Sequence, residues 1–140
     1  MQVANKLIET FVADSDKEFS RYEVDNILLS SEKWNFNYKK FEVYRVFVSY
    51  EEYEDTFKSR PVVVIKDKGD TVLCLKCTSK RKDNETYYQK YPIENWEIAG
   101  FTKPTYICLT STIEINKNFF FKKLGKLKSV DIDNLQEIGL

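Results

Sequence analysis

The chain has 140 residues, with 22 basic and 22 acidic side chains and 42% hydrophobic residues, so it can build one compact core and is not generally disordered. It has no histidine, which excludes every mechanism that needs an imidazole base, nucleophile partner or metal ligand. Three cysteines are too few for a disulfide scaffold, and no segment reads as a signal peptide or membrane span, so we expect a reducing, cytoplasmic location.

Residues 1–40 are predicted to form a helical extension with two short helices. Ser20 and Glu23 have the capping-box pattern, so the second helix is expected to run through Leu28 and end near Ser30. A helix-turn-helix DNA-binding unit is the alternative, but residues 1–60 carry a net charge of −3, which favours a packing role. The first helix is indicated by apolar residues at helical spacing: Val3, Ala4, Leu7, Ile8, Phe11 and Val12.

The composition changes near residue 40, and short strands are predicted from there on. Residues 41–50 are β-branched and aromatic with period two, which indicates a strand, and the acidic run 51–55 is expected to be a solvated loop. Residues 61–65 (PVVVI) form a continuous apolar run typical of a buried central strand. A turn at 67–70 then leads to a partner strand over 71–77.

The remaining chain is predicted to add strands and a terminal helix. A polar loop over 78–86 precedes a short strand at 87–91, and a later strand starts at residue 105. Ser129 is the expected N-cap of the last helix, which turns Ile132, Leu135 and Ile138 to one face. Together these elements predict a mainly β protein with helices (α+β), namely a small β-barrel with helical additions.

Four motif blocks occur in order along residues 41–140. They are SRPVVVI at 59–65, KCTS at 76–79, a stretch from Tyr91 to Thr105 that contains W-x-x-A-G-F-x-K-P-T, and KLGKL at 123–127 followed by Asp131. In this order and spacing they resemble the PemK/MazF family of toxin endoribonucleases. Residues 1–40 lie outside the resemblance, so the chain divides into an extension over 1–40 and a barrel domain over 41–140.

This resemblance implies a half-open β-barrel that forms a homodimer and cleaves single-stranded RNA without a metal or other cofactor. The substrate's own 2′-hydroxyl attacks the phosphate, and a cognate antitoxin blocks the groove. The net charge of +3 over residues 61–140 agrees with an anionic partner.

By the same resemblance, Arg60 and Thr78 are the catalytic candidates. Arg60 stays charged and can present two donors to a phosphate, and Thr78, at a predicted strand end, can bond the same group. Arg60 could instead pair with a carboxylate such as Glu54 or Asp55, and Thr78 could be a loop cap. The RNA-binding candidates are their neighbours in the sequence: Lys58, Ser59, Ser79, Lys80, Arg81 and Lys82.

The later strand departs from the family pattern. Where members often carry an arginine and an acidic residue, this chain has Cys108 and Thr110. A carboxylate from the acidic run 51–55 could replace the missing group, or the protein could be a catalytically lapsed relative that binds RNA or an antitoxin-like partner without cutting. The gyrase-poisoning branch of this fold fits less well, because no tryptophan follows Trp96.

Three further patterns in the sequence bear on function. Cys74 and Cys77 outline a metal half-site, but their odd separation on a strand puts the sulfurs on opposite faces and no second ligand pair exists, so no metal is expected. Tyrosines at 87, 88 and 91 could stack on bases or pack in the barrel. Phe119, Phe120 and Phe121 are expected in a core or dimer interface. Residues 1–40 could extend that interface or lie across the RNA groove as an acidic cover.

Overall fold

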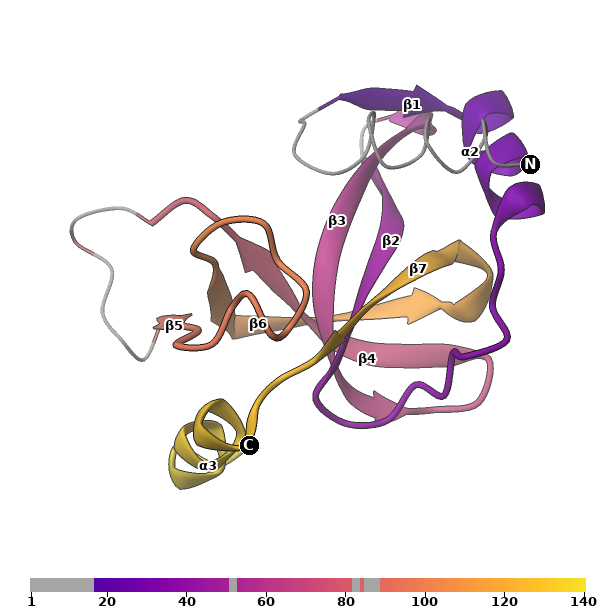
Figure 1. Cartoon of the computed structure of the whole chain (residues 1–140). Coiled ribbons are helices and arrows are strands. Elements are labelled where there is room, and N and C mark those ends of the chain that lie inside the picture. Colours follow the sequence, from indigo (N-terminus) through magenta and orange to yellow (C-terminus); the bar gives the residue numbers. More distant parts are fainter. Residues whose placement is uncertain (1–16, 51–52, 82–83, 85–88) are drawn as a thin grey trace.

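The structure is a computed structural model that describes residues 17–50, 53–81, 84 and 89–140. Antiparallel strands pair in the order β5-β6-β4-β3-β2-β7, and β1 adds to β3 beside this path. Within the described residues no pairing joins β5 to β7, so the sheet is strongly bent but not closed. The mainly β architecture with a C-terminal helix is confirmed, with α2 at one end of the molecule and α3 at the other (Figure 1). The elements are β1 (Glu18–Ser20), α2 (Arg21–Ser30), β2 (Glu42–Tyr50), β3 (Tyr53–Asp67), β4 (Thr71–Thr78), β5 (Lys90–Pro92), β6 (Tyr106–Asn116), the 3₁₀ turn η1 (Lys117–Phe119), β7 (Phe120–Lys126) and α3 (Ser129–Glu137).

The N-terminal extension contains one of the two predicted helices. α2 begins with the predicted capping box, in which the amide of Glu23 donates to Ser20 Oγ and the amide of Ser20 donates to Glu23 Oε1, both at 3.2 Å. The helix predicted over 3–12 lies outside the described residues. β1, which sequence patterns did not indicate, precedes α2 and pairs with residues 56–58 of β3, so the extension is joined to the sheet rather than separate from it.

β2 and β3 form a hairpin that is longer than predicted. Their pairing runs from Val43 opposite Val63 to Tyr50 opposite Tyr53. The prediction of a solvated loop over 51–55 is therefore wrong from Tyr53 onward. The register of the pairing shifts between Ser49 and Tyr50, and the Asp55 side chain, which lies within β3, remains exposed to solvent, so strand structure and charge do not conflict.

The hairpin from β3 to β4 agrees with the prediction. Gly69 in the turn has φ +101°, a conformation that glycine adopts without strain, and its amide donates to Asp67 Oδ1 at 2.9 Å. At the far end of the chain, α3 confirms the predicted helix, but its N-cap is Lys128 without a side-chain hydrogen bond. Ser129 is already the first helical residue, so its predicted capping role is wrong.

Three apolar clusters pack against the sheet. The first lies between the sheet, the 92–101 segment and α3, and the second lies on the other face around Tyr44, Val62 and Phe120. The third, here called the β1 aromatic cluster, joins the extension to the sheet through Phe19, Phe47, Phe57 and Phe121. Phe120 and Phe121 are thus core residues, as expected. No helix in the described ranges is both long and apolar enough to cross a membrane.

Candidate active site

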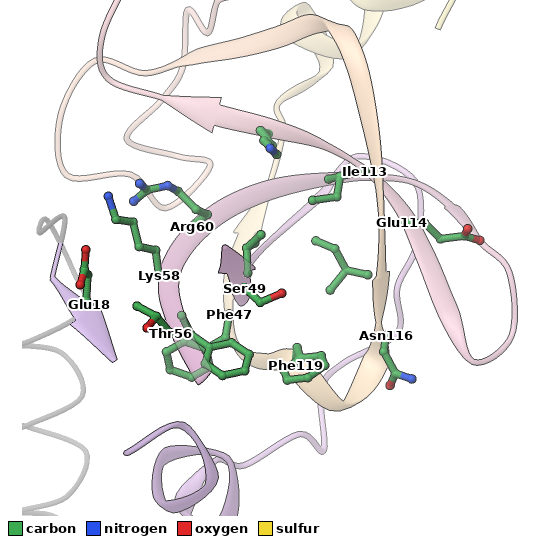
Figure 2. A pocket seen from close by; sticks show the side chains of 14 residues that line it. Glu18, Phe47, Ser49, Thr56, Lys58, Arg60, Ile113, Glu114, Asn116 and Phe119 are labelled. Atoms are coloured by element: carbon green, nitrogen blue, oxygen red, sulfur yellow. The ribbon is translucent and has the colours of Figure 1, made fainter. Parts of the chain in front are cut away.

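A groove of about 1060 Å³ lies on one face of the sheet, between the β1 end of β3 and the C-terminal half of β6. Its walls come from β1, β2, β3, β4, β6 and η1, which are far apart in the sequence (Figure 2). The bent sheet brings them together because the long strand β3 pairs with β1 and β2 near its start and with β4 further on.

Three basic side chains line this groove. Lys58 and Arg60 are two residues apart on β3, so both point to the same face of the sheet, and Figure 2 shows both side chains extending along one wall. Lys76 on β4 faces the groove from the neighbouring strand, where it pairs with Val62. The Arg60 guanidinium is held by a 3.2 Å hydrogen bond from its Nη1 to the carbonyl oxygen of Ser59. Such a row of cations can bind the phosphates of a polyanion.

Thr78 lies at the end of β4, beyond the residues that line the groove. The β3–β4 ladder ends at the pair Val62 and Lys76. Continuing that register by two residues along each strand would bring Thr78 level with Arg60, so the end of β4 lies beside the middle of β3. The Thr78 hydroxyl accepts a 3.1 Å hydrogen bond from the amide of Lys80, so it also caps the turn that follows.

The remaining predicted RNA-binding residues fall into two groups. Lys58 lines the groove, but Ser59 does not: it is 1% exposed and its hydroxyl accepts a 3.0 Å hydrogen bond from Arg45 Nη1. Neighbouring strand residues point to opposite faces, so placing Lys58 and Arg60 in the groove necessarily turns Ser59 away. Ser79, Lys80 and Arg81 are exposed after β4, with the Arg81 guanidinium 5.9 Å from the ring centre of Tyr106. Lys82 lies outside the described residues.

Sequence reasoning missed three charged residues of the groove. Lys76 could have been found by strand alternation, because it lies two residues before Thr78. Glu114 comes from β6, where it accepts a 2.9 Å hydrogen bond from Thr71 Oγ1 and pairs with Lys68 Nζ at 3.2 Å. The hydrogen bond from Thr71, followed by the contact with Lys68, lowers the pKa of Glu114. Glu18 comes from β1, and no local pattern indicated that strand.

The two residues that depart from the family pattern lie away from the groove. Cys108 is half-buried opposite Lys90, and Thr110 is exposed on β6. Neither lines the groove. On the later strand, Glu114 is the acidic residue among those that line the groove, but its carboxylate bonds Thr71 and Lys68, and Figure 2 shows it directed away from the groove.

The cysteine pair does not form a metal site. Cys74 packs in the cluster around Tyr44 and Cys77 packs in the cluster under α3, so the sulfurs lie on opposite faces, as the strand period predicts. Burial raises the pKa of the Cys74 thiol to about 12 and that of Cys77 well above its ordinary value. The part of the chain that the structure describes contains no group of three histidine, cysteine or acidic residues that could hold a metal ion.

Two of the motif blocks pack closely against each other, and this contact lies outside the groove. A Cβ atom on Gly100 would lie 2.2 Å from the carbonyl oxygen of Leu124, and one on Gly125 would lie 2.8 Å from the carbonyl oxygen of Ala99. The A-G and K-L-G motifs therefore bring two backbones into direct contact. Asp131 is fully buried and Tyr91 is 1% exposed; the Tyr91 hydroxyl donates to Asp131, so Tyr91 is a packing residue and does not stack on bases.

Comparisons with known proteins agree with this architecture. A family described as "PemK-like, MazF-like toxin of type II toxin-antitoxin system" matches residues 39–138. Among solved structures, one that matches is an endoribonuclease in complex with its cognate antitoxin from a mycobacterial species, with a TM-score of 0.51 and 13% sequence identity. The match covers 69% of this chain and 85% of that one, and at this identity it shows a shared fold. No protein of curated function matches. The family match spans all four motif blocks, and the chain therefore belongs to the family of PemK-like, MazF-like toxins of type II toxin–antitoxin systems.

Proposed function

We propose that this toxin is an endoribonuclease that cleaves single-stranded RNA by attack of the 2′-hydroxyl, without a metal. The observation that carries the proposal is the row of Lys58, Arg60 and Lys76 along one open groove. A groove lined by cations can bind a phosphodiester backbone.

The chemical roles follow from the side chains at the groove. Cleavage through a 2′-hydroxyl builds negative charge on the phosphate oxygens, and Arg60 can donate two charge-assisted hydrogen bonds to them. Thr78, at the adjacent strand end, orients the same phosphate through its hydroxyl. The products are a 2′,3′-cyclic phosphate and a free 5′-hydroxyl.

Two protein partners complete the proposal. The matched endoribonuclease was solved with its cognate antitoxin, which supports an antitoxin partner for this chain, and we propose that this antitoxin covers the groove. We also propose a homodimer, for which light scattering should give twice the chain mass of 16.6 kDa.

The decisive experiment incubates the pure protein with a long single-stranded RNA in excess EDTA. Wild type is expected to cut, and Arg60→Ala to lose at least 100-fold in rate, since a removed charge-stabilising donor costs about 10²–10³. Lys128→Ala, an exposed cation outside the groove, is the matched control and should cut like wild type.

Each alternative predicts a different result. Equal cleavage by wild type and Arg60→Ala would refute the catalytic role of Arg60. RNA that is bound but recovered intact would identify the lapsed binding protein, the second candidate. Cleavage that EDTA abolishes would refute the metal-free mechanism.

A further inference from the structure

The N-terminal extension holds Glu18 in a fixed position at the groove. Its neighbour Phe19 is 2% exposed in the β1 aromatic cluster, where its ring lies edge-on to Phe47 with centroids 5.4 Å apart. Because successive strand residues point to opposite faces, burying Phe19 turns Glu18 to the groove face. Ser20 then starts α2 through its capping box, so β1 is also anchored at its C-terminal end.

Glu18 lies beside the basic wall of the groove. It pairs directly with Lys58 across β1 and β3, which places both side chains on one face. Arg60, two residues further along β3, is its diagonal neighbour, and such residues lie about 7–8 Å apart. Figure 2 shows Glu18 on the same side of the groove as Lys58 and Arg60. A phosphodiester bound by Arg60 would thus have the Glu18 carboxylate beside it.

The second acidic residue that lines the groove, Glu114, already has its carboxylate bound to other side chains. Glu114 stands on the opposite wall in Figure 2, bonded to Thr71 and Lys68. The Glu18 side chain, in contrast, has no hydrogen bond or ion pair within the described ranges. With no histidine in the chain and with Cys108 and Thr110 outside the groove, Glu18 is the groove carboxylate that is both near Arg60 and available to accept a proton.

We propose that Glu18 is a catalytic residue, the general base that takes the proton from the attacking 2′-hydroxyl. This inference rests on the proposed function. As the proton moves to the carboxylate, the 2′-oxygen forms a bond to phosphorus, the bond from phosphorus to the 5′-oxygen breaks, and the leaving oxygen takes a proton from water. Glu18 then returns its proton to solvent. Residue 18 lies outside the family match over 39–138, so this chain has its base on a segment of its own.

The test compares Glu18→Gln with Glu32→Gln, an exposed glutamate of the same extension that does not line the groove. Glu18→Gln is expected to lower kcat about 100-fold, the ordinary contribution of a general base. Its affinity for an RNA that carries 2′-deoxyribose at the cut should stay equal or rise, because a negative charge leaves the groove. The wild-type rate should fall on acidification, and the Glu18→Gln rate should not. Glu32→Gln should match wild type in every measurement.

Other outcomes overturn the assignment in distinguishable ways. A wild-type rate for Glu18→Gln would show that the Glu18 carboxylate takes no part in catalysis. A faster rate would show that its negative charge repels the RNA. A loss of affinity parallel to the loss of rate would make it a positioning residue. If wild type cuts and Arg60→Ala does not, these outcomes refute Glu18 alone. If wild type fails to cut, the proposed function falls as well.

Discussion

Asp131, in the first turn of α3, accepts a 2.6 Å hydrogen bond from the hydroxyl of Tyr91, which lies 40 residues earlier on β5. The same carboxylate accepts backbone hydrogen bonds from Glu94 at 2.8 Å and Asn95 at 3.1 Å. It therefore fixes the segment after β5 against α3. The aspartate of the last motif block is an anchor of the fold, remote from the groove.

Replacing this anchor should destabilise the protein without changing its chemistry. In Asp131→Asn, the amide nitrogen would face hydrogen-bond donors, so we expect the free energy of unfolding to fall by about 2–3 kcal/mol. Urea denaturation measures this change. Asp133→Asn, an exposed neighbour on the same helix, should stay within about 0.5 kcal/mol of wild type. Equal effects of the two substitutions would contradict the anchoring role.

At Gly100, the free-energy cost of a steric clash can be measured separately from the cost of its positive φ angle. Gly100 and Gly69 both have φ +101°, but an added Cβ atom meets Leu124 only at Gly100 and open space at Gly69. Gly69→Ala should therefore cost about 1–2 kcal/mol in backbone strain alone. Gly100→Ala should cost about 2 kcal/mol more, because the backbone of Leu124 must move. Thermal unfolding of the two variants gives the comparison, and similar melting temperatures would refute the steric argument.

Stability in acid should depend on Glu42. Burial disfavours the charged form of Glu42, but hydrogen bonds from Lys123 Nζ at 2.7 Å, Tyr44 Oη at 2.6 Å and the Lys39 amide at 2.8 Å outweigh it, so its pKa lies below the ordinary 4.5. The unfolded chain binds the proton more readily. The stabilisation is therefore complete above pH 4.5 and is lost as the pH falls through the pKa of the folded state.

Glu42→Gln tests that dependence directly. The variant should lose about 3 kcal/mol at neutral pH, since it leaves Lys123 without its buried partner. Its unfolding free energy should also change less with pH below 4.5 than that of wild type. Denaturant titrations at several pH values measure both effects, and identical slopes for the two proteins would show that another group controls acid unfolding.

Lys76 should contribute to RNA affinity through charge alone. If it contacts one phosphate, Lys76→Ala should reduce the slope of log affinity against log salt by about 0.7, the value per phosphate for single strands. Filter binding of a non-cleavable RNA at several salt concentrations measures the slope. Lys128→Ala should leave it unchanged. An unaltered slope in Lys76→Ala would place the RNA backbone elsewhere.

Local signals in the sequence correctly predicted several elements. The capping box at Ser20 marked α2, the Gly69 turn marked the β3–β4 hairpin, and the apolar run at 61–65 marked buried strand positions. These features succeed because their causes lie within a few residues. The terminal helix was also predicted, although helical spacing does not decide whether Ser129 caps it or begins it.

Features set by distant contacts were not predictable. β1 has only three residues, Glu-Phe-Ser, and exists as a strand because the edge of β3 is available to it. The face of Ser59 depends on the register of β3, and Tyr91 is buried because Asp131 lies across from it. Glu18 and Lys76 line the same groove because the whole sheet is bent. Motif spacing could locate Arg60 but not its neighbours in space.

The insertion of Phe19 among Phe47, Phe57 and Phe121 has a practical consequence for shortened forms of the protein. A chain that starts after α2 would expose these rings and leave the β1-facing edge of residues 56–58 unpaired. An open apolar strand edge recruits strands from other molecules. Loss of the extension is therefore expected to cause self-association. In a comparison of short and full chains, a difference in aggregation would then mask any difference in catalytic rate. We therefore expect the extension to keep the rest of the protein soluble as well as to complete its sheet.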